Sequence, residues 1–291
     1  MSIVVTGATG QLGRLVVDAL LADPAVPAGS VAAVVRDKER AADLADRGVE
    51  LRIADYDRPE TLAGAFGAGD RVLLISGSEV GRRVPQHAAV IDAAKAAGVA
   101  QLAYTGVLGG PDADFDLAAE HKETEALILA SGLPHTFLRN GWYSENYTAN
   151  LAPVLAHGAV VANAGEGRVA SATRADYAAA AAAVLTGPLD EHTGRAYELS
   201  GDEAWSLAEY AAEVAARSGR EIVYTNVPAA AHLEILTGAG VPEPFAAILV
   251  DVDEAIARGS LAVRTGDLAR LIGRPTTPIG TTVAEALAAA G

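Results

Sequence analysis

Three glycines stand three residues apart near the start of the chain, at Gly7, Gly10 and Gly13. An apolar run at residues 3–5 precedes them and apolar residues at helical spacing follow them, so the order is strand, glycine turn, helix. In a dinucleotide site the first glycine permits a tight bend, the second lets the backbone approach a pyrophosphate, and the third lets the helix pack on the strand. The phosphates lie at the positive helix N-terminus. The pattern predicts a nucleotide-binding turn; the alternative is a turn whose glycines serve close packing alone.

The residue after the second predicted strand bears on which nucleotide is bound. Arg36 stands there, followed by Asp37, with Lys38 and Arg40 close by. An acidic residue at this point accepts a hydrogen bond from the ribose 2′-OH of NAD, whereas an arginine can hold the 2′-phosphate of NADP. We therefore favour NADP(H) over NAD(H) as the cofactor. The alternative is that Arg36 belongs to a solvated helix N-terminus.

Polar residues also follow the third and fourth predicted strands. Asp55-Tyr56 is placed to meet an adenine edge, or else to cap the short helix that begins at Pro59. Ser76, Gly77 and Ser78 follow the fourth strand, where the chain would run past the ribose and the pyrophosphate.

The sequence lacks the Tyr-x-x-x-Lys pair of ordinary short-chain dehydrogenases. In that pair the lysine lowers the pKa of the tyrosine, so that the phenol can pass a proton near neutral pH. The chain's lysines are Lys38, Lys95 and Lys122, and the residues four positions before them are Val34, Ile91 and Ala118. Alcohol dehydrogenation by that dyad is therefore not expected.

Other chemistry-bearing residues follow the fifth and sixth predicted strands. Tyr104 ends the fifth strand, His121 lies on the next helix, and Asn140 ends the sixth, followed by Trp142 and Tyr143. Flat aromatic walls with amide donors suit a flat conjugated acceptor, so we predict hydride transfer to such a molecule. Asn140, Tyr104 and His121 are the candidate catalytic residues, and the protein would mainly supply orientation. The alternatives are that Trp142 and Tyr143 belong to the core and that His121 is an exposed helix residue.

Strand and helix signals alternate through the first half of the chain, which predicts a parallel sheet wound with helices. The expected strands cover residues 3–6, 31–35, 49–54, 71–75, 101–104 and 135–138. A first helix ends near residue 21, and further helices are expected at residues 38–47, 59–66, 85–97 and 117–130. Less regular signals follow, with strands at residues 197–199 and 222–225 and helices at 176–185 and 206–217. We predict an α/β fold in which residues 1–141 form the nucleotide-binding domain, while residues 142–291 complete the sheet and form a smaller substrate lobe.

Composition narrows the class of protein. The 291 residues are 51% hydrophobic, enough for a large core, yet no run approaches the ~18 apolar residues of a membrane span. A net charge of −15 argues against nucleic acid or an anionic membrane as partner. The absence of cysteine excludes disulfides and thiolate catalysis, and the histidines lack metal-ligand spacing, so no metal site is expected. Because the chain begins with a strand rather than a basic leader, we expect a cytoplasmic location.

Longer runs carry a family resemblance. They are T-G-A-T-G-Q-L-G at 6–13, V-V-R-D at 34–37, L-L-I-S-G-S-E-V-G at 73–81, N-G-W-Y-S-E-N-Y at 140–147 and S-A-T-R-A-D-Y at 171–177. The chain resembles the NADPH:quinone oxidoreductase type 2 group of the NmrA-like atypical short-chain dehydrogenases, with triphenylmethane reductase a near relative. That family shares the departure from Tyr-x-x-x-Lys.

The resemblance implies a Rossmann-like doubly wound parallel sheet with a smaller C-terminal α/β lobe, NADP(H) in the cleft, and a possible homodimer. It implies reduction of a quinone or similar small conjugated acceptor; the alternative is an NADP-sensing NmrA-like regulatory protein without turnover. Together with Asp55 and Tyr104, the candidate cofactor-binding residues are Thr6, Gly7, Ala8, Thr9, Gly10, Gln11, Leu12, Arg36, Ser76, Gly77, Ser78, Asn140, Gly141, Trp142, Tyr143, Ser144, Glu145 and Arg174.

Overall fold

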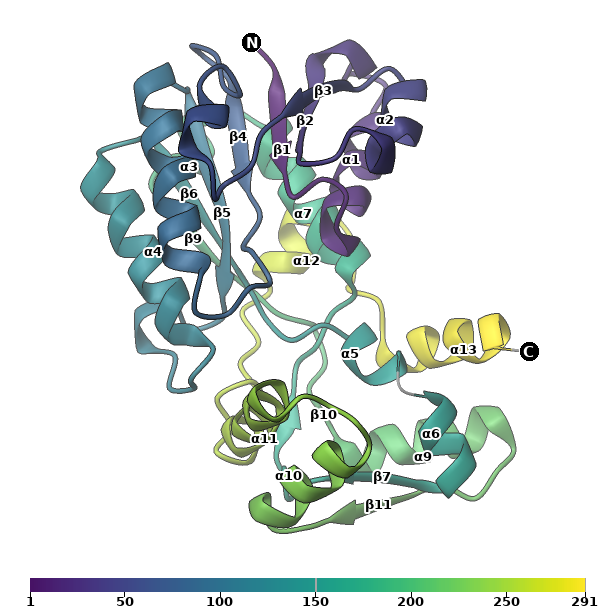
Figure 1. Ribbon diagram of the computed structural model, residues 1–291. Coiled ribbons are helices and arrows are strands. Elements are labelled where there is room, and N and C mark those ends of the chain that lie inside the picture. Colours follow the sequence, from purple (N-terminus) through teal and green to yellow (C-terminus); the bar gives the residue numbers. More distant parts are fainter. Residues whose placement is uncertain (150, 291) are drawn as a thin grey trace. The chain divides into compact units, whose positions relative to one another are not determined.

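Short apolar segments form the central sheet of the computed structural model, which describes residues 1–149 and 151–290. In this part of the chain, seven strands pair in the order β3-β2-β1-β4-β5-β6-β9 (Figure 1). Their bounds are β1 (Ile3–Thr6), β2 (Val31–Val35), β3 (Glu50–Ile53), β4 (Arg71–Leu74), β5 (Gln101–Val107), β6 (His135–Asn140) and β9 (Arg195–Leu199). The pairs from β3 to β6 are parallel. The strand order reverses between β1 and β4, which is the edge where doubly wound sheets bind their ligands.

Helices cover both faces of this sheet. Figure 1 shows α3 (Arg83–Ala97) and α4 (Ala118–Ser131) on one face, and α1 (Gln11–Ala22) and α7 (Arg174–Thr186) on the other. Both layers bury the sheet, so β2 and β4 carry apolar side chains on both faces and are buried along their whole length. A core cluster that includes Val4, Leu74, Val90 and Phe137 lies among the sheet, α3 and α4. The predicted doubly wound parallel sheet is confirmed.

The described chain divides into two compact units, and each is discontinuous in sequence. The first comprises residues 1–111, 119–140 and 174–198, and therefore holds the sheet with its helices. The second comprises residues 112–118, 141–173 and 199 onward. The first unit thus recruits α7 and β9 from the second half of the sequence.

The second unit is built on two small sheets. Strand β7 (Ala159–Ala162) pairs in parallel with β11 (Val223–Asn226), and β8 (Arg168–Val169) pairs antiparallel with β10 (Trp205–Ser206). Its helices are α5 (Glu145–Thr148), α6 (Leu151–His157), α9 (Leu207–Ser218), α10 (Ala229–Gly238), α11 (Glu243–Ala257), α12 (Asp267–Ile272) and α13 (Ile279–Ala290). A capping box between Ser206 and Glu209 starts α9, because each side chain accepts a hydrogen bond from the other's backbone amide.

Several predicted bounds differ from the structure. Strand β5 continues three residues past Tyr104, because residues 105–107 pair with the extended end of β6. The helix expected at 38–47 is a 3₁₀ turn (Glu39–Ala41) followed by the five-residue α2 (Ala42–Asp46). The helix expected at 59–66 is only a 3₁₀ turn, Pro59–Leu62. The short connections η1 (Ala28–Ser30), η4 (Gly110–Asp112) and α8 (Leu189–His192) complete the described elements.

Candidate functional site

The glycine turn after β1 has the conformation that a dinucleotide site needs. Gly7 has φ +59°, in the left-handed region that favours glycine. At Gly13 a Cβ atom would overlap the carbonyl oxygen of Gly7 and the Cα of Ala8, so only glycine lets α1 lie this close to the turn. Gly10 is the N-cap of α1, and no described side chain caps this end. The helix therefore starts with unpaired N–H groups on its positive end, which is where a pyrophosphate binds.

The other residues predicted to bind the cofactor at this turn differ in how far their side chains are exposed. Gln11 is exposed and Thr9 is half-buried, so both side chains can meet a ligand. Ala8 and Leu12 are buried and contribute backbone alone. The Thr6 side chain is fully buried at the end of β1, where its hydroxyl accepts a hydrogen bond from the amide of Ile75 at 3.1 Å. Thr6 therefore joins the ends of β1 and β4 instead of facing solvent.

Arg36 and Asp37 follow β2, and their charged groups differ in whether a cofactor can reach them. Asp37 accepts hydrogen bonds from the amides of Glu39 and Arg40, at 2.9 and 3.3 Å. A hydrogen bond with the Glu39 side chain, and then these backbone bonds, lower the pKa of the Asp37 carboxyl. Its carboxylate is thus occupied within its own turn. The Arg36 side chain is 64% exposed and meets Glu79 across 3.7 Å. The exposed guanidinium, and not the carboxylate, is the group that a ligand at this edge can reach.

Asp55 lies at the end of β3 in a turn that uses its carboxylate. The amide of Asp57 donates to it at 3.2 Å, and Arg58 forms an ion pair with it at 3.4 Å. The neighbouring Tyr56, which the sequence suggested only as part of an adenine edge, is the better candidate for contact with the glycine turn. Burial raises the pKa of Tyr56 to about 12, opposed by hydrogen bonding to Thr6 and to the Gly7 backbone. Tyr56 is therefore a neutral phenol that supports the turn.

The segment after β4 is held by side chains from three other elements. The amide of Ile75 donates to Thr6 of β1, and the amide of Ser76 donates to Oγ1 of Thr105 on β5 at 2.9 Å. The amide of Gly77 donates to Nε2 of His87 on α3 at 3.0 Å. Three successive amides are thereby used within the protein. A ligand at this edge has the side chains of Ser76 and Ser78 left to contact, together with the backbone beyond Gly77.

His87 has a defined tautomer because of this contact. Its Nε2 accepts from the Gly77 amide, so the proton is on Nδ1, which donates to the hydroxyl of Thr124 at 2.9 Å. Thr124 in turn donates to the carbonyl of Glu120 at 2.8 Å. Burial, and then the charge of Arg83, lower the pKa of His87 to about 4, so the ring is neutral at pH 7. Sequence reasoning missed His87 and Arg83; their four-residue spacing on α3, directly after the polar loop, was the available signal.

Tyr104 and His121 are brought together, but inside the protein. The tyrosine hydroxyl lies 2.8 Å from Nδ1 of His121, and the two residues are 0% and 5% exposed. The alternative that His121 is an exposed helix residue is therefore wrong: α4 turns it onto the sheet. Burial raises the pKa of Tyr104, and burial with the charge of Arg83 lowers the pKa of His121 to about 3. Both groups are neutral at pH 7 and neither pKa lies near the value that favours general acid catalysis.

Asn140 lies at the end of β6, apart from that pair. Tyr104 is in register with Phe137, and Val107 with Asn140, so Asn140 is three residues beyond the level of Tyr104. Side chains alternate along a strand, and an odd offset places Asn140 on the opposite face of the sheet from Tyr104. The Asn140 carbonyl accepts from the amide of Leu108 at 2.9 Å, which ties the end of β6 to the end of β5.

An ion-pair network next to Asn140 anchors the loop after β5. Arg139 forms two hydrogen bonds to the Glu125 carboxylate, at 2.9 and 2.7 Å, and a third to Glu198 at 2.7 Å. These carboxylates raise the pKa of Arg139. Glu198 also accepts from the amide of Gly109 at 2.8 Å. Gly110 has φ +48°, which favours glycine, and a Cβ there would displace the Arg139 guanidinium.

The remaining predicted cofactor residues, 141–145, lie in the second unit. Tyr143 forms a bridge with Ala172, and the amide of Ser144 donates to the Ala172 carbonyl at 2.9 Å. The Ser144 hydroxyl is fully buried and lies 2.8 Å from that of Ser171. The side chains of Trp142, Tyr143 and Glu145 are half-buried. Arg174 belongs to the first unit, where it begins α7 and is half-buried.

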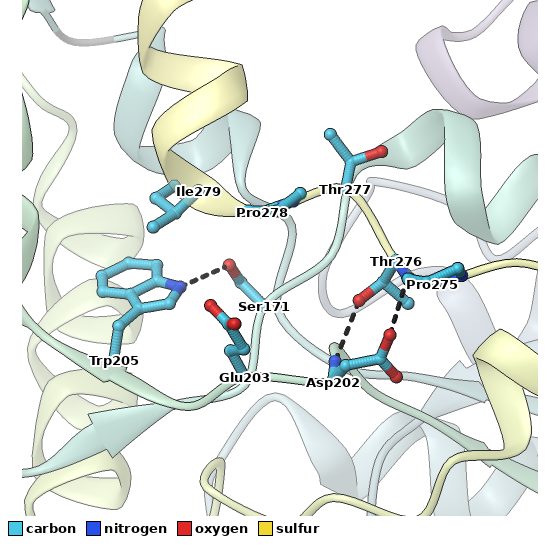
Figure 2. Close-up of a pocket in the computed structure, with 9 residues that line it drawn as sticks. All are labelled: Ser171, Asp202, Glu203, Trp205, Pro275, Thr276, Thr277, Pro278 and Ile279. Atoms are coloured by element: carbon cyan, nitrogen blue, oxygen red, sulfur yellow. Dashed lines mark hydrogen bonds between the residues drawn. The ribbon is translucent and has the colours of Figure 1, made fainter.

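A cavity of about 100 Å³ adjoins Ser171 in the second unit (Figure 2). The Trp205 indole donates to the Ser171 hydroxyl at 3.2 Å and forms one wall. Asp202 and Thr276 close another side through two reciprocal hydrogen bonds of 2.9 and 2.7 Å. The cavity is therefore linked to residues 144–147 through the pair of serine hydroxyls and through Trp205, whose ring centroid lies 4.8 Å from that of Tyr147.

The fold and the turn geometry together define a Rossmann-type dinucleotide-binding protein. Residues 1–259 match the model of the NmrA-like family, and the chain belongs to that family. It is 45% identical to quinone oxidoreductase 2 of Escherichia coli over 97% of this chain and 98% of the relative. It is 32% identical to the NAD(P)H azoreductase of Xenophilus azovorans over 94% of this chain and 93% of that protein. These matches confirm the family resemblance.

Solved structures agree with this assignment. The NADPH complex of the Escherichia coli NADPH-dependent quinone oxidoreductase superimposes with a TM-score of 0.94 at 45% identity, covering 98% of this chain and 99% of that one. The NADP(H) complex of the Citrobacter sp. triphenylmethane reductase gives 0.92 at 41% identity, covering 98% and 100%. Within the described residues, no helix is long and apolar enough to span a membrane.

Proposed function

We propose that this protein is an NADPH-dependent oxidoreductase that transfers hydride to a quinone or a similar conjugated acceptor. The observation that carries the proposal is the turn after β1, where Gly13 has no room for a Cβ and α1 begins with uncapped amides. Quinone, azo-dye and triphenylmethane reductases among the relatives support the acceptor class. The regulatory alternative lacks such support, because the NmrA structure is only 16% identical and shows the fold alone.

The first unit contains the groups that would hold the cofactor. The amides at the start of α1 would bind the pyrophosphate, and Arg36 would bind the 2′-phosphate. Ser76 and Ser78 would line the path of the ribose. When bound, NADPH supplies the hydride from its nicotinamide ring.

The chain contributes orientation to this reaction more than acid catalysis. Tyr104 and His121 stay neutral inside the core, so we assign them to support of the sheet end and of the loop after β4. Asn140 would orient the acceptor, and solvent would supply the proton to its delocalised anion. Such a reaction gains mainly from alignment of the two reactants.

Arg36→Ala tests the proposal most directly. Since only NADPH carries a 2′-phosphate, we expect its Kd to rise about 10- to 100-fold, the loss of a charge-assisted contact, while the NADH Kd changes less than about twofold. The measurement is fluorescence titration of both cofactors, with NADPH consumption followed on a panel of quinones and dyes. Equal losses would remove Arg36 as the selector. Tight binding with no turnover on any acceptor would instead favour the regulatory alternative.

A cytoplasmic location and a homodimer remain expectations from the sequence. Cell fractionation tests the first. Light scattering of the purified protein tests the second.

A further inference from the structure

Glu79, in the loop between β4 and α3, carries an inference that rests on the proposed function. Its Oε1 faces the guanidinium of Arg36 at 3.7 Å. Its Oε2 is contacted by Arg82 at 3.2 Å and by the Gln86 amide at 3.4 Å. Gln86 is 6% exposed and also donates to Asp57, which pairs with Arg82 at 2.9 Å. The carboxylate therefore has a defined place beside the arginine that would take the 2′-phosphate.

Glu79 and Arg36 attract each other as opposite charges but form no hydrogen bond. At 3.7 Å the contact is too long for a hydrogen bond, so Glu79 does not hold the Arg36 side chain in one orientation. Its charge still acts on whatever binds there. A phosphate bound to Arg36 would carry close to two negative charges within a few ångströms of this carboxylate. A ribose 2′-OH in the same place is neutral and can donate a hydrogen bond to it.

We propose that Glu79 determines how strongly this protein prefers NADPH over NADH. As the counter-ion of Arg36 it weakens 2′-phosphate binding and leaves NADH usable. Arg82 and Gln86 keep it in place when Arg36 turns to the phosphate. The preference for NADPH is therefore the difference between one attractive and one repulsive charge, not the effect of Arg36 alone.

Glu79→Gln tests this because it removes the charge and keeps a side chain that can bond to Arg82. We expect the NADPH Kd to fall about three- to tenfold at low ionic strength, with a smaller gain at high salt. The NADH Kd should stay within about twofold or rise slightly, because an amide oxygen still accepts from a hydroxyl. Glu123→Gln, at an exposed position on α4, is the control for the same change in net charge.

Fluorescence titration of both cofactors to wild type and the two variants gives the answer. An equal shift for NADPH and NADH, or weaker NADPH binding in Glu79→Gln, would overturn the inference, because the carboxylate would then be structural. A gain of the same size in Glu123→Gln would overturn it too. Failure of the wild type to bind either nucleotide would refute the proposed function itself, which is a separate outcome.

Discussion

Two turns flank the point where the strand order of the sheet reverses, and they are held in different ways. The turn after β1 is possible because two of its residues have no side chain. Gly13 has no room for a Cβ, and Gly7 takes a left-handed φ of +59°. The turn after β4 is held by hydrogen bonds that three successive backbone amides donate to the side chains of Thr6, Thr105 and His87. The first keeps its amides for a ligand, whereas the second uses its amides to stay rigid. Rigidity and ligand binding are thus divided between neighbouring turns.

The largest expected effect comes from filling the space in the first turn. Gly13→Ala places a methyl group on the Gly7 carbonyl, where backbone must move, so we expect a loss of about 3 kcal/mol or more in unfolding free energy, with NADPH binding abolished or much weakened. Chemical denaturation and cofactor titration measure both. Gly29→Ala is the matched control, since nothing lies within 4 Å of a Cβ there, and it should cost less than about 0.5 kcal/mol. Wild-type stability in Gly13→Ala would contradict the packing described for this turn.

Acid should loosen the helix layer that holds the second turn. The pKa values of His87 and His121 are lowered to about 4 and about 3 by burial and by the charge of Arg83. Below about pH 6.5 the unfolded chain therefore binds protons that the folded chain does not, and stability falls as pH drops towards 4. We expect a loss of a few kcal/mol over this range, measured by urea unfolding.

Two substitutions isolate the contribution of one histidine to that acid sensitivity. His87→Gln removes a buried titrating group and should flatten part of the pH dependence. His157→Gln, at an exposed position, is the control for the same substitution. If both variants follow the wild-type curve, burial of the neutral His87 ring does not govern acid stability.

The smallest effect should come from a single bond in the second turn. His87→Leu leaves the Gly77 amide without its acceptor, so we expect the NADPH KM to rise about three- to tenfold, with kcat within about twofold. His87→Gln places an amide oxygen near the position of Nε2 and should restore most of the KM. Steady-state kinetics with a quinone separates the two parameters. Equal behaviour of the Leu and Gln variants would mean that the hydrogen bond does not set the turn.

The two turns also differ in how far the sequence alone predicts them. The Gly7, Gly10 and Gly13 spacing predicted the first turn, because a missing side chain at a fixed spacing is a local property. Nothing local in Ile75-Ser76-Gly77 indicated that these three amides donate to side chains from β1, β5 and α3. Asn140 and Tyr104 were grouped because both lie near strand ends, yet the register places them on opposite faces.

The alternation of strands and helices, the doubly wound sheet and the glycine turn follow from the amino-acid order, because they depend on periodicity and on the conformational freedom of single residues. The burial of His121 against Tyr104 and the approach of Glu79 to Arg36 depend instead on the folded arrangement. Burial and charge pairing are set by which distant segments meet. Arg36 and Glu79 are 43 residues apart along the chain and neighbours in space only because β2 and β4 both flank β1.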